Sequence, residues 1–267
     1  MTALQWAGFS ASILIGMSLG LMGGGGSILT LPVLVYLLGL HPILSTVYSL
    51  FVVGMTSLVG SVSYMRRQHI SYKAAVLFSI PSFLAVYLTR RYLLPLIPDP
   101  LMTTATFVLR KDMALMLLFG GVMLAASVGM IRHPRLSDRL ESQPVRFNIP
   151  VIVLDGILVG LLTGLVGAGG GFMIIPVLVV LIRLPMKTAV GTSLLIIAAN
   201  TLIGFRSGAA NLTIDWPFLL TFTSLSILGS LLGTYLSRFI AGHKLKSAFG
   251  WFVLVVGMYI ISRELLV

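Results

Sequence analysis

The chain has 267 residues, of which 57% are hydrophobic and only 9% are charged, and its mean hydropathy is +1.05. Soluble domains carry about 25% charged residues, so the composition excludes a water-soluble fold and predicts an all-α polytopic membrane protein. The net charge of +11 comes from Lys and Arg in short loops between apolar runs, which indicates cytoplasmic loops and not nucleic-acid binding.

Apolar segments follow one another in the same order in two parts of the chain, with a glycine run between the first two segments of each part. The first part, 1–131, contains the predicted membrane segments 6–22, 27–40, 43–64, 73–97 and 113–131. The longest polar stretch, 132–149, is basic and is predicted to be a cytoplasmic linker. The second part, 150–267, contains the predicted segments 150–166, 172–184, 187–205, 216–239 and 247–263.

The two parts align without gaps at an offset of 144 residues, over a stretch of about fifty residues. At this offset "GLMGGGGSILTLP", 20–32, corresponds to "GLVGAGGGFMIIP", 164–176, and Ser49 corresponds to Ser193. Apolar matches are common between membrane segments, whereas matched Gly, Pro and Ser residues are not. The alignment therefore predicts two homologous membrane repeats joined by the linker.

The segment after the first glycine run, 27–40, is too short to cross a membrane, because thirteen helical residues rise only about 20 Å. The glycines either interrupt one long helix or form the tip of a helical hairpin that ends inside the membrane. The basic residues favour a hairpin, which places Arg183, Lys187, Arg238 and Lys244 on the cytoplasmic side with the linker. A returning hairpin followed by three membrane helices makes the second half inverted relative to the first, as in many secondary transporters.

The glycine runs suggest how the protein binds a ligand. Glycine lets backbone N–H groups approach a ligand closely, and the start of the following helix carries unpaired N–H groups and a partial positive charge that attract anions. Two inverted runs predict a central anion site near the midplane, where the two tips approach each other. The alternative is that the glycines only allow close helix packing. The substrate-binding candidates in the runs are Gly23, Gly24, Gly25, Gly26, Ser27, Gly167, Gly169, Gly170 and Gly171.

Polar side chains inside the apolar segments are further candidates for substrate binding. Ser49 and Thr56 are seven residues apart and share one helix face, and the corresponding Ser193 and Asn200 repeat that spacing. Thr192 directly precedes Ser193. These side chains either line the anion site or form hydrogen bonds within the helices that carry them.

Two charged residues have candidate roles in transport. Asp155 is an acid inside an apolar run, which makes it a proton-coupling candidate, although its position also suits the membrane interface. Arg206 ends its segment and either attracts anions to the outer mouth or extends to the interface. The chain has no cysteine, and its four histidines lie at loops or segment ends without ligand spacing, so neither a metal nor another cofactor is predicted.

The second glycine motif, followed by "KTAVGTSLLIIAANTLIG" at 187–204, resembles the TauE/SafE family of sulfite and organosulfonate exporters. The stretch "STVYSLFVVGMTSLVG", 45–60, is similar to the same element, with Val47 and Tyr48 in place of Gly191 and Thr192. The likeness covers nearly the whole chain. It implies a multi-pass protein of the bacterial inner membrane that exports small sulfur-containing oxyanions without an enzymatic step.

An alternative function is an anion channel or a permease for another small carboxylate or oxyanion, because the sequence does not distinguish alternating access from an open pore. A membrane enzyme is disfavoured, since the acids are few and no nucleophile–base pair is evident. The expected partners are a small anionic substrate and the lipid bilayer. A coupling proton and a homodimer stay open, and no nucleic-acid partner is expected.

Overall fold

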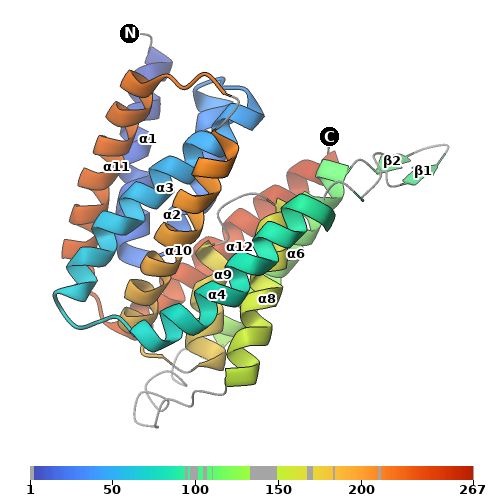
Figure 1. The fold of residues 1–267 in the computed structure, drawn as a ribbon. Helices are drawn as coiled ribbons and strands as arrows, with labels where there is room; N and C mark the ends of the chain where they lie inside the picture. The colour runs from blue at the N-terminus through green and yellow to red at the C-terminus, as the bar shows by residue number, and fades with distance from the viewer. Residues whose placement is uncertain are drawn as a thin grey trace.

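The described part of the chain is mainly helical (Figure 1). The computed structural model describes residues 3–93, 96, 102–104, 107–109, 111–132, 149–166, 171–182, 184–209 and 212–266. Its α-helices are α1 (Ala3–Met22), α2 (Gly25–Pro32), α3 (Pro42–Met65), α4 (Tyr72–Leu88), α6 (Lys111–Arg132), α8 (Ile149–Val166), α9 (Gly171–Pro176), α10 (Met186–Gly208), α11 (Trp216–Leu236) and α12 (Gly242–Leu266). Three π-helical turns extend α2, α4 and α9: η1 (Val33–Leu37), η2 (Thr89–Leu93) and η3 (Val177–Leu181).

These helices confirm the predicted helical, polytopic fold. Within the described residues, four segments are long and apolar enough to cross a membrane: Leu44–Met65, Tyr72–Leu93, Met186–Arg206 and Trp216–Leu236. Three shorter apolar helices accompany them: Ala7–Met22, Ile149–Leu162 and Ser247–Arg263. A short antiparallel hairpin of β1 (Met102–Thr104) and β2 (Phe107–Leu109) precedes α6 and was not predicted. Most of the predicted linker, 133–148, lies outside the described residues.

The first glycine run reverses the chain into a helical hairpin. The helix α1 ends at Met22 and α2 begins at Gly25. On the returning arm, Gly26 packs against the carbonyl oxygen of Ile15, and Leu38 contacts Gly8 near the start of α1. The hairpin interpretation therefore holds for the first half. Of the second run, Gly167, Gly169 and Gly170 lie outside the described residues, and Gly171 begins α9.

Small residues bring helices of the two halves into close contact. In one pair, α1 packs against α11 with Gly16 against the carbonyl oxygen of Ser226. In the other pair, α8 packs against α4 with Gly160 against the carbonyl oxygen of Ser82. Gly16 corresponds to Gly160 and Ser82 to Ser226 at the offset of 144, so the same contact is made twice. Small-residue stripes of this kind let helix backbones approach in membranes.

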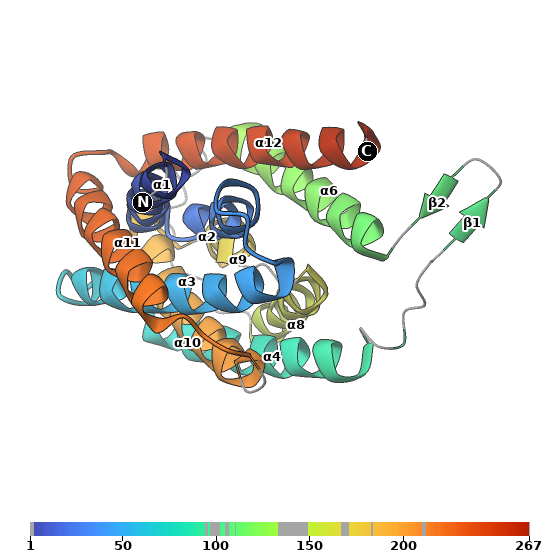
Figure 2. The same ribbon diagram turned by 90° about the horizontal axis from the view of Figure 1, so that it is seen from above.

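The corresponding helices α3 and α10 pack against each other near the centre of the molecule and run in opposite directions (Figure 2). At one end, Arg67 after α3 donates a hydrogen bond to the carbonyl oxygen of Thr234 near the end of α11, 3.3 Å away. At this same end, burial lowers the pKa of His69, and the positive charge of Lys187 at the start of α10 lowers it further. At the opposite end, Phe51 of α3 contacts Phe205 near the end of α10.

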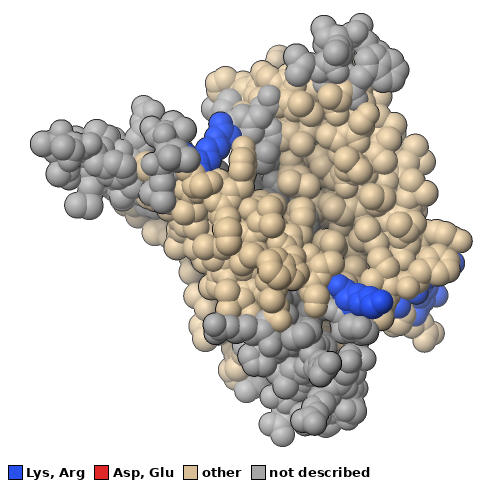
Figure 3. Space-filling view, turned by 180° about the vertical axis from the view of Figure 1, so that it is seen from behind, with Lys and Arg blue, Asp and Glu red and all other residues tan. Residues whose placement is uncertain are grey.

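Basic residues gather at the end that holds the α3–α4 and α11–α12 turns. Burial lowers the pKa of Arg67, and the nearby charge of Arg238 lowers it further. Arg66 and Lys187 lie at the same end, beside Arg67 and near His69 respectively. Figure 3 shows basic side chains along the lower margin of one face and a further group at the upper left.

Candidate functional site

The turn between α1 and α2 requires glycine. Gly23 has a φ of +75°, a left-handed conformation that residues with a Cβ rarely adopt. Its N–H donates to the carbonyl oxygen of Leu19 at 2.7 Å, and the N–H of Gly24 donates to that of Met22 at 2.9 Å. The chain thus turns within two residues, and both of these N–H groups already have partners.

This turn lies against residues of the second half. A Cβ added to Gly23 would stand 2.6 Å from Ser193 Oγ and 3.1 Å from the carbonyl oxygen of Val190, both in α10, and 3.2 Å from Ile175 Cδ1 in α9. Ser193 is seven residues after Met186, which places the turn about 10 Å along α10. The first tip therefore lies inside the helical bundle, beside α10 and Ile175 of α9.

Backbone N–H groups at the start of α2 are the donors that an anion could use. Gly25 and Gly26 are the first two residues of α2, so no carbonyl of the same helix can reach their N–H groups. The N-cap, Gly24, has no side chain to bond them. The hydroxyl of Ser27 donates to the carbonyl oxygen of Gly24 at 2.7 Å. The positive end of the α2 dipole thus faces the turn.

The polar side-chain candidates have different surroundings. Ser193 is fully buried and donates to the carbonyl oxygen of Val190 at 2.9 Å. Asn200 is half-buried, and its Nδ2 lies 3.5 Å from Ser82 Oγ. Ser49 is buried, and Thr56 is fully buried with no hydrogen-bond partner for its hydroxyl among the described residues. Of this group, Ser193 is the side chain that contacts the first glycine turn.

Comparison with known proteins gives the family. The family model described as "Sulfite exporter TauE/SafE" matches residues 8–260, nearly the whole chain. The chain belongs to the TauE/SafE family. A protein of Xylella fastidiosa (strain Temecula1) named "Probable membrane transporter protein" is 30% identical over 94% of this chain and 92% of its own length. YunE of Bacillus subtilis, which carries the same description, is 25% identical over 82% of this chain and 83% of its own. No solved structure is significantly similar.

The protein therefore belongs to a family of multi-pass membrane transporters and not to a family of enzymes. Within the described residues, no group of three or more His, Cys, Asp or Glu side chains has the arrangement of a metal site. The groups that the described hairpin presents at its turn are backbone hydrogen-bond donors and the positive end of a helix dipole, which are features of anion sites in other proteins.

Two further hydroxyls of the TauE/SafE protein connect the two halves. The hydroxyl of Tyr48 in α3 accepts the N–H of Asp215, the N-cap of α11, at 2.7 Å. The hydroxyl of Thr192 in α10 accepts the N–H of Ser71, the N-cap of α4, at 3.0 Å. Both residue pairs correspond at the offset of 144, so the substitution of Tyr for Thr preserves the bond. These hydroxyls lie at helix starts and not at the described glycine turn.

The N-cap residues of these bonds were missed from the sequence, although the offset relates them. Ser71 and Asp215 each begin a helix and each accept the N–H three residues later, which is a common capping pattern. Their backbone N–H groups are then held by a hydroxyl from the other half. A sequence signal could have identified Ser71 and Asp215: they correspond at the offset of 144, and both are residue types that commonly cap helix N-termini.

The two charged candidates of the TauE/SafE protein, Asp155 and Arg206, lie on helices other than the two that form the first glycine turn. Asp155 lies in α8 and is half-buried; one carboxylate oxygen, Oδ2, is buried without a hydrogen-bond partner in the described part of the chain. Arg206 is exposed in the last turn of α10, next to Phe205 of the aromatic contacts at that end. At the membrane interface Asp155 could pair with a linker arginine such as Arg146, which lies outside the described residues.

Proposed function

We propose that this protein is a secondary transporter that exports sulfite or an organosulfonate across the bacterial inner membrane. The family supports the transport of small sulfur oxyanions. The observation that carries the proposal is the glycine turn inside the bundle, where Gly23 lies beside α10 of the other half and the start of α2 offers the N–H groups of Gly25 and Gly26. Uncapped helix starts favour small anions over cations or neutral solutes.

The halves are proposed to be inverted repeats. Helices α3 and α10 correspond at the offset of 144 and pack in opposite directions, which supports a two-fold axis in the membrane plane. The paired bonds of Tyr48 and Thr192 support the same relation, because each half caps a helix of the other. An inverted pair lets the two halves exchange roles, so that a central site opens to one side and then to the other.

The basic end of the bundle is proposed to face the cytoplasm. Arg66, Arg67, Lys187 and Arg238 lie at this end, and short loops rich in Lys and Arg stay on the cytoplasmic side. Both chain termini then lie outside. Positive charge at this entrance also raises the local concentration of an anionic substrate before export.

The bound anion is proposed to contact the backbone at the start of α2 and the matching glycines of the second half, with Ser193 at its edge. Each backbone hydrogen bond to a charged ligand contributes about 1.5–3 kcal/mol, so a few N–H groups suffice for binding without Lys or Arg. Asp155 is proposed to couple export to protons, because an intramembrane carboxylate whose buried Oδ2 has no hydrogen-bond partner among the described residues can exchange a proton during the cycle.

The test is transport by the purified protein in liposomes. Radiolabelled sulfite and taurine are offered with acetate as a carboxylate control, under an imposed pH gradient. A transporter accumulates the sulfur anion in a saturable manner that depends on the gradient. Unitary conductance in a planar bilayer would instead identify a channel, and preference for acetate would identify a carboxylate permease. Absence of any anion flux in a monodisperse, folded preparation would contradict the proposal.

A further inference from the structure

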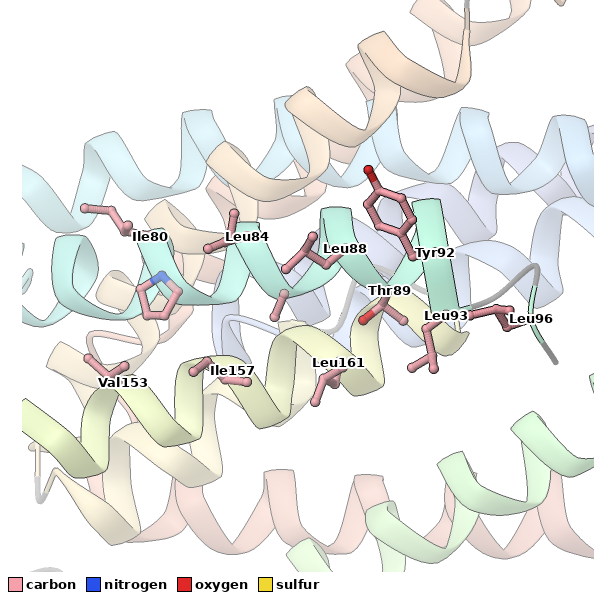
Figure 4. A pocket seen from close by; sticks show the side chains of 12 residues that line it. Ile80, Leu84, Leu88, Thr89, Tyr92, Leu93, Leu96, Val153, Ile157 and Leu161 are labelled. Atoms are coloured by element: carbon pink, nitrogen blue, oxygen red, sulfur yellow. The ribbon is translucent and has the colours of Figure 1, made fainter.

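An apolar groove lies on the outside of the bundle between α4 with its extension η2 and α8 (Figure 4). Its volume is about 590 Å³, and its walls include Leu84 and Leu88 of α4 and Ile157 and Leu161 of α8. Leu84 is 55% exposed and Ile157 is 38% exposed, so the groove opens toward the surroundings of the bundle. In a membrane protein of this family those surroundings are lipid chains.

The groove arises from particular side chains on α4. Ala85 and Thr89 both line it. At the corresponding positions α11 has Gly229 and Gly233, and backbone atoms of α1 occupy the space that a Cβ there would need. Helices α1 and α11 are therefore in direct contact at the positions where α4 carries larger side chains and a groove remains beside α8. The groove is a local feature of one half and does not follow from the repeat.

Thr89 offers a hydrogen bond inside this apolar wall. Its side chain is 1% exposed, and its hydroxyl has no hydrogen-bond partner among the described residues. Figure 4 shows the oxygen directed from α4 toward the gap to α8. Buried hydroxyls without partners are uncommon and destabilising. A ligand that brings an oxygen acceptor to this depth would remove that cost.

The dimensions and the charge near one end of the groove indicate the ligand. The lining within α4 and η2 extends from Ile80 to Leu93, thirteen residues apart, and thirteen helical residues rise about 20 Å, about two thirds of the roughly 30 Å hydrocarbon core. Tyr92 lines this end, and the exposed Arg91 is its neighbour in the chain. Tyr and Arg are typical of the level of the lipid headgroups.

We propose that this groove binds one glycerophospholipid with an anionic headgroup. One acyl chain lies along Leu84, Leu88 and Leu161, an ester carbonyl oxygen accepts the hydrogen bond of Thr89, and the phosphate lies near Arg91. The apolar walls match the chain, the buried donor matches the ester at the boundary between chain and headgroup, and the cation matches the phosphate. The site is separate from the glycine turn and does not depend on which anion is transported.

The test counts phospholipid bound to the full-length protein by native mass spectrometry, with phosphatidylglycerol and with phosphatidylcholine of the same acyl chains. Leu84→Trp fills the groove, whereas Leu228→Trp is a matched control at the corresponding, 56% exposed position of α11. The parent and Leu228→Trp should each retain one phosphatidylglycerol, and Leu84→Trp should lose it. Thr89→Val, which keeps the side-chain shape, should weaken binding of both lipids about five-fold.

The charge is tested separately with Arg91→Gln, which should weaken phosphatidylglycerol and leave phosphatidylcholine nearly unchanged. These two polar variants keep the test valid if Leu84→Trp fails to fold. Equal lipid retention by Leu84→Trp and Leu228→Trp would overturn the proposal. A parent that is dimeric and becomes monomeric in Leu84→Trp, with no change in bound lipid, would also overturn it, because a second copy would then cover the groove.

Discussion

Replacing Gly23 by Ala should destabilise the protein for two separable reasons. The φ of +75° is a left-handed conformation that costs a residue with a Cβ roughly 1–2 kcal/mol. The added Cβ would also stand 2.6 Å from Ser193 Oγ and 3.1 Å from the carbonyl oxygen of Val190. Ser193 can rotate away only by giving up its hydrogen bond to Val190, which adds about 1 kcal/mol. The expected loss is about 2–3 kcal/mol.

Gly39→Ala is the matched control. Gly39 has a φ of +68°, and a Cβ added there meets nothing within 4 Å. It should therefore show the backbone cost of roughly 1–2 kcal/mol without the contact. The assay is thermal and denaturant unfolding of both variants in the same detergent, followed by tryptophan fluorescence and by size-exclusion chromatography of the heated samples.

A double variant isolates the contact between the halves. Ser193→Ala removes the hydroxyl, so Gly23→Ala combined with Ser193→Ala should lose less stability than the sum of the two single changes. Additive losses, or equal losses for Gly23→Ala and Gly39→Ala, would refute the packing of the glycine turn against α10. They would also remove the geometric basis for placing the anion between the two halves.

Three other predictions follow from the bonds between the halves, the carboxylate and the topology. Tyr48→Phe and Thr192→Val each leave the N–H of a helix N-cap without its acceptor and should lower unfolding stability by about 1 kcal/mol or more; unchanged melting of both would contradict these bonds. Asp155→Asn should keep sulfite exchange in liposomes and lose pH-driven accumulation, and intact accumulation would rule out the proton role. Lys244→Cys, the single cysteine in a cysteine-free chain, should react with an impermeant maleimide only from the cytoplasmic side; labelling from outside would mean parallel halves.

The helices and their order could be predicted from the sequence because apolar length and glycine breaks determine them locally. The prediction for segment 6–22 agrees with α1, and that for 187–205 agrees with α10. The hairpin was favoured by the short arm 27–40, which cannot cross the membrane by itself, together with the basic residues of the second half. The helix contacts at Gly16 and Gly160, which also correspond at the offset of 144, were not predicted.

The position of the glycine turn could not be predicted from the sequence. The symmetry of the runs suggested tips that face each other; the structure places Gly23 beside Ile175 and Ser193, and Gly167, Gly169 and Gly170 lie outside the described residues. Helix length and tilt decide this depth, and neither is encoded in a local motif. The hydrogen-bond partners of the candidate hydroxyls could not be predicted either. Ser27 donates to the backbone of its own turn, and Thr192 accepts the N–H of Ser71. Sequence spacing gives the helix face of a hydroxyl but not its partner.

The central claim is that the backbone at the start of α2 holds the transported anion. The most direct measurement is equilibrium binding of radiolabelled sulfite to purified Gly25→Ala, with Gly39→Ala as the control and melting curves to confirm that both are folded. A Cβ at Gly25 restricts the approach of the ligand to the N–H groups and should cost more than about 1 kcal/mol of binding, a loss of at least five-fold, while Gly39→Ala binds like the parent. Equal affinity of Gly25→Ala, Gly39→Ala and the parent would show that the glycines serve packing alone.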